Sequence, residues 1–387
     1  METITAKLTL QGDNLKIVWS YKGLDFPAYC IDKSDVKKSA DKIRSCLGKL
    51  VARGMEQEDG RRLRTSGDLL RDLAGLGWEL YNVIFDAVEG DAERVKRWLE
   101  GLNDKCRVMF SVDRRVHIPW GMIFDSDPSL LSGLVEDVEV ASYGSFWCLK
   151  YSLTTVYSRI PPTTLGNATE PVRFRLLPVW SAGCLEKAQP WLAPDETSNI
   201  SWLRTCSELP AIASADLFER WRIIGDKIGL LFFYCHGGPD CLSIGQGDVI
   251  TITEFKYRLR REEAAHDRPA CLTFLNGCTT AVGNPDGGFL EATGGAGYCG
   301  FIGTETEVPD VFALRFSLAF LFLFLQEKKT LLEAMDRLRR THFPLSILYS
   351  VYGHPDVCGE PDILFQSVPK PPSDENFSFG RLGSSTL

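Results

Sequence analysis

Leu230-Leu-Phe-Phe-Tyr-Cys-His236-Gly-Gly238 is a short apolar run that ends in a histidine and two glycines, and Ala270-Cys-Leu-Thr-Phe-Leu-Asn-Gly-Cys278 repeats this design with a cysteine at its end. Such short apolar runs, β-prone and closed by glycine, are typical of buried β-strands. The interval between them holds one helix and one short connection, so the strands can lie side by side and parallel. Parallel strands end at one edge of a sheet, where open α/β folds bind their ligands. We therefore expect His236 and Cys278 to meet at that edge.

A cysteine beside a histidine is the chemistry of a thiol nucleophile with its base. An unaided thiol has a pKa of about 8.5, so hydrolysis needs a nearby base that supplies thiolate and later protonates the leaving amine. His236 can do both. Gly237 lets the backbone approach a substrate carbonyl closely, and its N–H and that of Cys278 can form an oxyanion hole.

Each of the two residues also has a structural explanation. Cysteine is often simply buried, and a lone histidine at a strand end is more often a core residue than a base. Cys235, one position before His236, points to the opposite face of its strand and belongs to the core. Two suitable residues at the ends of two strands, each with glycine beside it, favour the catalytic interpretation.

The surrounding sequence resembles the CHAT proteases, bacterial relatives of caspases and separases. After the histidine, Leu242-Ser-Ile-Gly-Gln-Gly-Asp248 is similar to the family's short hairpin. After the cysteine, Gly300-Phe-Ile-Gly-Thr-Glu-Thr-Glu-Val-Pro-Asp310 is similar to its next strand and turn. Upstream, His117-Ile-Pro-Trp120 resembles the family's Ile-Pro-Trp-Glu segment, and Val351-Tyr-Gly-His-Pro355 resembles its closing strand and turn.

This resemblance extends over roughly residues 1–357 and implies an α/β fold, a caspase-like α/β/α sandwich with a mostly parallel sheet. It implies that His236 is the general base, Cys278 the nucleophile and Gly237 an oxyanion donor. The implied enzyme is a cysteine endopeptidase.

The resemblance also implies two halves. Residues 1–185 would form a degenerate caspase-like half, which contains His117 but no matching cysteine, and residues 186–358 the catalytic half. The boundary is expected near the loop-rich, proline-containing stretch 181–201. Residues 359–387, with several prolines, serines and aspartates, are expected to form a flexible tail.

Two positions depart from the family, and both concern acidic side chains. Gly121 stands where the family has a glutamate after Ile-Pro-Trp, so no role is carried over to it. Leu314 stands where separases that cut after arginine have an acidic residue, so we expect peptides with arginine before the scissile bond to be poor substrates. Asn276, Glu305 and Glu307 are assigned with Leu314 to the substrate pocket, although solvated turn carboxylates are the simpler interpretation of the two glutamates.

Composition and motifs exclude several other classes. The chain has 387 residues, 44% of them hydrophobic, enough for one large core or two joined cores. A net charge of −8 argues against direct nucleic-acid binding. The twelve cysteines lack metal-site spacing, so we expect a reducing compartment and neither metal nor cofactor. Gly295-Ala-Gly-Tyr-Cys-Gly300 has the GxGxxG pattern of a dinucleotide-binding loop. Such a loop must follow a strand and open a helix, whereas this segment is expected to follow a helix and open a strand, so the match is not meaningful.

Location and membrane contact follow from the apolar segments. The N-terminus lacks a basic region followed by an apolar one, so we expect no secretory signal and a cytoplasmic protein. The most apolar stretch, residues 316–325, is too short to cross a bilayer and is expected to be a helix packed on a sheet. Thr330 and Glu333 predict a capping box at the start of the following helix.

Hydrophobic periodicity predicts the remaining elements. They are a hairpin over residues 4–19, helices over 34–55 and 63–87, and strands over 107–112, 138–143 and 172–179.

The resemblance implies work on a partner protein in bacterial antiviral defence or regulated cell death, with a pore-forming gasdermin as one candidate target. No sensor domain is visible in the sequence, so the trigger is expected to be a separate activating protein. Two alternatives stay open: a catalytically idle interaction module, and a hydrolase or transferase of small molecules. The interval between Cys278 and the strand at Phe301 is short, so we expect the intact chain to become active without cleavage, by partner binding that orders a loop near the dyad.

Overall fold

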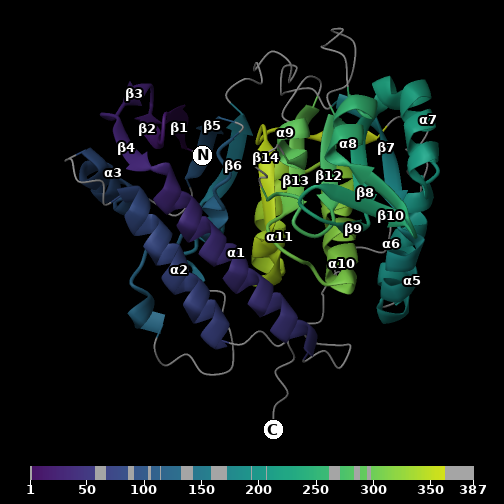
Figure 1. Cartoon of the computed structure of the whole chain (residues 1–387), viewed down its shortest axis with the longest axis horizontal. Coiled ribbons are helices and arrows are strands. Elements are labelled where there is room, and N and C mark those ends of the chain that lie inside the picture. The colour runs from purple at the N-terminus through teal and green to yellow at the C-terminus, as the bar shows by residue number, and fades with distance from the viewer. Residues whose placement is uncertain are drawn as a thin grey trace.

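The computed structural model describes residues 2–56, 67–85, 91–102, 106–113, 115–131, 143–157, 172–192, 194–205, 207–260, 271–282, 288–293 and 298–361. These residues form a mixed α/β fold around a twelve-stranded, mostly parallel sheet that runs across the whole molecule, with helices packed against it (Figure 1). The predicted fold class is confirmed. A separate three-stranded sheet consists of β9 (His236–Gly237), β10 (Cys241–Gly245) and β11 (Asp248–Thr251).

The C-terminal part of the central sheet carries the two predicted site strands. Its order is β7 (Val172–Trp180), β8 (Ile228–Tyr234), β12 (Cys271–Asn276) and β13 (Tyr298–Thr304), all parallel, followed by the antiparallel β14 (Tyr349–Gly353). Every residue of β8, β12 and β13 is buried, because helices cover both faces of such a sheet. This burial explains why the strands are continuous apolar runs in the sequence.

The N-terminal part of the sheet is continuous with the C-terminal part. β1 (Thr3–Gln11) and β2 (Asn14–Tyr21) form the predicted hairpin, and β5 (Arg107–Val112) lies parallel between β1 and β6 (Ser152–Tyr157). β6 then pairs with β14. The edge strands are β3 (Leu24–Asp25) and β4 (Tyr29–Asp32).

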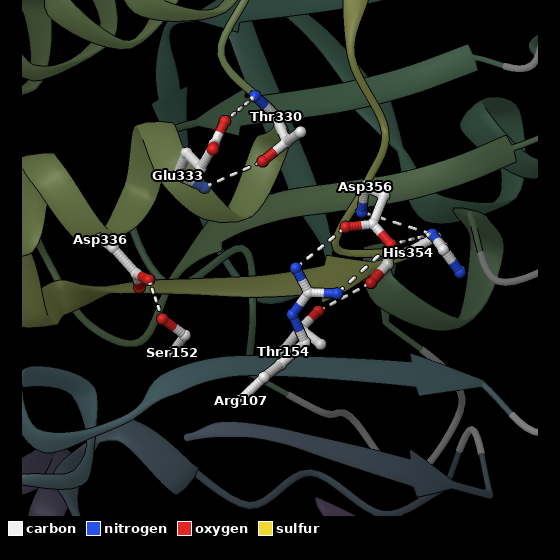
Figure 2. A network of polar contacts seen from close by, with 9 residues as sticks. Arg107, Ser152, Thr154, Thr330, Glu333, Asp336, His354 and Asp356 are labelled. Atoms are coloured by element: carbon white, nitrogen blue, oxygen red, sulfur yellow. Dashed lines mark hydrogen bonds and ion pairs between the residues drawn. The ribbon is translucent and has the colours of Figure 1, made fainter. Parts of the chain in front are cut away.

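Polar contacts fasten the two parts of the sheet where β14 meets β6 (Figure 2). The guanidinium of Arg107 lies 3.0 Å from the carboxylate of Asp356. The hydroxyl of Thr154 donates a 2.7 Å hydrogen bond to the carbonyl of Gly353. These bonds join residues 199 and 249 positions apart in the sequence and supplement the few backbone pairs at this junction.

The two predicted helices of the N-terminal part are present as α1 (Lys33–Glu56) and α2 (Gly67–Phe85). They lie side by side (Figure 1). The other helices are α3 (Asp91–Glu100), α4 (Trp147–Lys150), α5 (Ala182–Ala188), α6 (Pro194–Thr205), α7 (Ser214–Ile224), α8 (Ile252–Arg258), α9 (Phe289–Thr293), α10 (Asp310–Leu321) and α11 (Leu331–Thr341). Short 3₁₀ turns cover Trp120–Met122, Pro128–Leu131, Gln189–Trp191, Gly225–Lys227 and Leu345–Leu348.

The apolar helix α10 packs against the sheet, as predicted. It continues into a π-helical turn, Phe322–Gln326, and the ring of Phe316 stacks on Tyr349 of β14 with ring centroids 3.9 Å apart. In the part of the chain that the structure describes, no helix is both long and apolar enough to cross a membrane. The capping box at the start of α11 is also confirmed, with Thr330 and Glu333 bonded reciprocally (Figure 2).

Two stretches differ from the predictions, and a third lies almost entirely outside the described residues. Residues 181–201 are mostly helical, in α5 and α6. Their prolines do not interrupt these helices, because Pro190 lies in the 3₁₀ turn between them and Pro194 is the first residue of α6, a position that tolerates proline. The first residues of the predicted tail form β15 (Gly359–Pro361), which pairs in parallel with β7, whereas residues 362–387 lie outside the described part. Of the predicted strand 138–143, only Tyr143 is described, with 3₁₀ conformation, so the strand stays a prediction.

Candidate active site

The two predicted site residues extend neighbouring parallel strands. In the pairing of β8 with β12, Tyr234 lies opposite Asn276. His236 and Cys278 each follow two residues later, so both leave the sheet at the same level of the same edge. The backbone N–H of Cys235 still bonds to the carbonyl of Asn276 at 3.4 Å, which keeps the two segments together beyond the strands.

The backbones of the two segments touch at Gly237 and Cys278. A Cβ atom placed on Gly237 would lie 2.9 Å from the carbonyl oxygen of Cys278 and 3.0 Å from its nitrogen. Carbon atoms this close to backbone are not tolerated, so the contact requires glycine. Gly237 therefore lies against the backbone of the predicted nucleophile.

Cys278 lies in a strained turn. The next residue, Thr279, has a φ of 56°, which is a left-handed conformation and an outlier for a β-branched side chain. Its N–H bonds to the carbonyl of Thr306 at 3.1 Å, and the N–H of Ala281 bonds to that of Thr304 at 2.9 Å. Such strain persists only where surrounding contacts impose it, and it concentrates at functional sites. The partly exposed thiol of Cys278 is thus held on a turn bonded to the end of β13 and the segment after it.

The surroundings of Cys278 disfavour its thiolate. Burial raises the pKa of the thiol, and the carboxylates of Glu307 and Asp310 raise it further. The backbone N–H of Val308, directed at the sulfur, acts in the opposite direction but is outweighed. In this conformation the thiol is therefore protonated at neutral pH.

His236 is exposed and has two polar neighbours that sequence reasoning missed. An imidazole nitrogen of His236, the Sγ of Cys184 and a carboxylate oxygen of Asp310 all lie within 4.8 Å of one another. Cys184 is on α5 just after β7, and Asp310 begins α10 shortly after β13. The sequence contained a signal for Cys184 and Asp310, because each follows the carboxyl end of a parallel strand, where ligand sites of open α/β sheets lie.

Two of the four predicted pocket residues lie in the core. Asn276 is 2% exposed, and its amide donates to the carbonyl of Ala313 at 2.7 Å and accepts from the hydroxyl of Tyr349 at 2.8 Å. Leu314 is 4% exposed, within α10. Both side chains are engaged in packing, which favours structural roles over substrate contact.

The two glutamates have different surroundings. The carboxylate of Glu305 is buried, accepts a 2.9 Å bond from the guanidinium of Arg44 and a 2.5 Å bond from the hydroxyl of Ser350. Glu307 is exposed and close enough to Cys278 to affect its pKa. Of the two, Glu307 is the acid that a substrate side chain could reach.

Packing explains why Gly121 stands where the Ile-Pro-Trp-Glu pattern has a glutamate. A Cβ atom on Gly121 would lie 3.1 Å from the Cβ of Cys148 in α4. The site is too tight to take a larger side chain without displacement.

Comparisons with known proteins give one curated relative and several solved structures. No family model matches the chain. A protein named probable protease, from Vitiosangium sp. (strain GDMCC 1.1324), is 31% identical over 218 residues, which are 51% of this chain and 27% of that protein. The chain thus matches about a quarter of the length of this relative. Among solved structures, the Arg-specific cysteine proteinase gingipain R is 11% identical, with a TM-score of 0.46 and coverage of 84% of this chain and 76% of its own. The Saccharomyces cerevisiae separase–securin complex is 11% identical, with a TM-score of 0.49 and coverage of 91% of this chain and 30% of its own.

Proposed function

We propose that the chain is a cysteine endopeptidase of the CHAT type, with Cys278 as nucleophile and His236 as base. The observation that carries the proposal is the contact of Gly237 with the backbone of Cys278. Together with the pairing of β8 and β12, it brings His236, Cys278 and the N–H groups of Gly237 and Cys278 to one edge of the sheet. The curated relative named probable protease supports the same reaction class.

The reaction would proceed through an acyl-enzyme. His236 takes the proton of the Cys278 thiol, and the thiolate attacks the peptide carbonyl. The N–H groups of Gly237 and Cys278 stabilise the oxyanion. The imidazolium then protonates the leaving amine, and water hydrolyses the thioester with His236 again acting as base.

The raised pKa of Cys278 leads us to propose that the activity of the peptidase is regulated. A protonated thiol reacts slowly, so the present conformation corresponds to a resting enzyme. Movement of the segment that contains Glu307 would remove one cause of the raised pKa. Binding of a separate activating protein is the proposed cause of that movement, with the chain left uncut.

The biological setting belongs to the same proposal. We propose a role in bacterial antiviral defence or regulated cell death, with a partner protein such as a gasdermin-like effector as substrate. In this view residues 1–185 are a degenerate half that supports the catalytic half, residues 186–358.

An electrophilic cysteine probe tests the nucleophile directly. Probe labelling at Cys278 should depend on His236, and Cys278→Ala and His236→Ala should abolish cleavage of the natural target about equally, because the two residues act as a unit. Cys184→Ala is the matched control and should retain cleavage. Cleavage that survives Cys278→Ala but not Cys184→Ala would transfer the nucleophile role to Cys184.

The same experiment separates the two alternative functions. An idle interaction module would show no His236-dependent labelling at Cys278, although partner binding would persist. A small-molecule hydrolase would show the labelling and turn over a small amide, but would cleave no protein. Intact mass spectrometry of the activated enzyme then tests the control mechanism: activity that arises only after a cut between residues 279 and 300 would contradict activation of the uncut chain.

A further inference from the structure

Cys184 is a buried thiol beside the proposed base, and the proposed mechanism does not use it. Its sulfur, an imidazole nitrogen of His236 and a carboxylate oxygen of Asp310 lie within 4.8 Å of one another. The three side chains come from α5, β9 and the start of α10, so the sheet edge rather than a local sequence motif brings them together.

The three donor atoms are of the types that Zn²⁺ binds. Thiolate, imidazole and carboxylate are its usual protein ligands, and tetrahedral bonds of about 2.0–2.3 Å separate such donors by about 3.5 Å. Each pair of donor atoms would have to approach by about 1.3 Å at most, which side-chain rotation can supply. A thiolate and an imidazole in one set also favour Zn²⁺ over Mg²⁺ and Ca²⁺, which prefer oxygen donors.

The backbones that carry these ligands are fixed relative to one another. The hydroxyl of Tyr234, at the end of β8, lies 2.9 Å from the carbonyl oxygen of Asp310 and 3.4 Å from that of Cys184. The backbone N–H of His236 is directed at the sulfur of Cys184, and this bond stabilises a thiolate. The buried side chain of Tyr234 and the backbone N–H of His236 thus fix the positions of the three ligand residues relative to one another.

Burial raises the pKa of the Cys184 thiol, so the group is protonated in the absence of a cation. Metal binding would replace this proton: the S–H bond breaks, a sulfur–zinc bond forms and the proton passes to solvent. No redox partner is required.

We propose that Cys184, His236 and Asp310 form a Zn²⁺ site, and that the bound cation holds the peptidase inactive by occupying the imidazole that Cys278 needs. The fourth position of a tetrahedral ion would be open to water. Metal binding stands on the geometry alone, whereas the inhibition rests on the proposed function.

Binding is tested first on the full-length Cys278→Ala chain, so that the proposed nucleophile contributes no thiol and no turnover. Titration with Co²⁺ as a spectroscopic probe should give a thiolate charge-transfer band that saturates at one ion per chain and is displaced by Zn²⁺. Adding Cys184→Ala should remove the band and weaken Zn²⁺ binding at least tenfold. Adding Cys241→Ala, which removes a partly exposed thiol on the nearby β10, should change neither.

Unchanged Zn²⁺ affinity in the Cys184→Ala background, or no saturable binding at all, would overturn the site. Circular dichroism confirms that each variant is folded, and Cys184→Ser replaces Cys184→Ala if the latter is not.

Inhibition is tested separately on the chain with Cys278 intact: Zn²⁺ should block His236-dependent labelling of Cys278, and Cys184→Ala should restore it. Cys184-dependent binding without an effect on labelling would refute the inhibition. Absent labelling in the metal-free chain would instead refute the proposed function and leave the site standing.

Discussion

The guanidinium of Arg44 on α1 lies 2.9 Å from the fully buried carboxylate of Glu305, in the segment that follows β13. The same segment bonds to the turn of the proposed nucleophile, because Thr306 accepts the N–H of Thr279. A helix of the N-terminal part is therefore connected to the Cys278 turn through one ion pair and one short stretch of backbone. This connection gives the N-terminal part a physical means of affecting the site.

Replacement of Arg44 should be severely destabilising. Arg44→Met keeps most of the aliphatic packing but leaves the Glu305 carboxylate buried without its cation, which should cost about 3–5 kcal/mol. Urea denaturation measures the loss. Lys42→Met, on the same helix, breaks an exposed pair with Glu79 and should cost less than about 1 kcal/mol. Equal losses in the free energy of unfolding of the two variants would show that the buried Arg44–Glu305 pair contributes no more to stability than the exposed Lys42–Glu79 pair.

Gly237 should not tolerate a side chain, whereas its neighbour should. The Cβ of Gly237→Ala would collide with the Cys278 backbone at 2.9–3.0 Å, so the oxyanion geometry should be lost and kcat/KM should fall at least about 100-fold. Gly238→Ala is the matched control, since its nearest contact is an ordinary 3.5 Å. Thermal melting shows whether both variants remain folded. Full activity in Gly237→Ala would argue against this oxyanion site.

Glu307 should control the reactivity of Cys278. The carboxylate contributes to the raised pKa of the thiol, so Glu307→Gln should lower that pKa and speed alkylation by iodoacetamide near pH 8. The pH dependence of the labelling rate, read by mass spectrometry at Cys278, gives the apparent pKa. Glu93→Gln, an exposed glutamate on α3, should leave the profile unchanged. A profile that is identical in Glu307→Gln and the parent chain would contradict the electrostatic explanation.

The sequence predicted the strands of the site because their signal is local. β8 and β12 are buried on both faces, so each is a continuous apolar run, and the glycines after them mark where the chain leaves the sheet. Parallel pairing of the two strands followed from the length of the connection. The prediction that residues 181–201 are rich in loops was wrong, because Pro190 lies in a 3₁₀ turn and Pro194 is the first residue of a helix, where proline is tolerated.

The surroundings of the site could not be predicted in the same way. Cys184 and Asp310 meet His236 from separate elements, and Arg44 meets Glu305 from a third. The strand ends before Cys184 and Asp310 indicate the sheet edge, but which side chains meet there depends on strand order and helix packing rather than on any spacing in the sequence. Glu305 illustrates the difference. Its position after a strand indicated either a pocket acid or a solvated turn residue, but only the packing of α1 shows that the carboxylate is buried beside Arg44.

Two histidines outside the dyad should make the fold sensitive to acid. Burial lowers the pKa of both His117 and His342 to about 4, from 6.5 in an unfolded chain. Between these values the unfolded chain binds more protons, so stability is complete above pH 6.5 and is lost as the pH falls toward 4. Because both imidazoles are partly exposed, we expect about 1–2 kcal/mol from each. Urea unfolding at pH 7 and pH 4.5 gives the slope, and His342→Gln should make it shallower even if the variant is less stable at both pH values. A slope that does not change in His117→Gln or His342→Gln would assign the acid sensitivity to carboxylates.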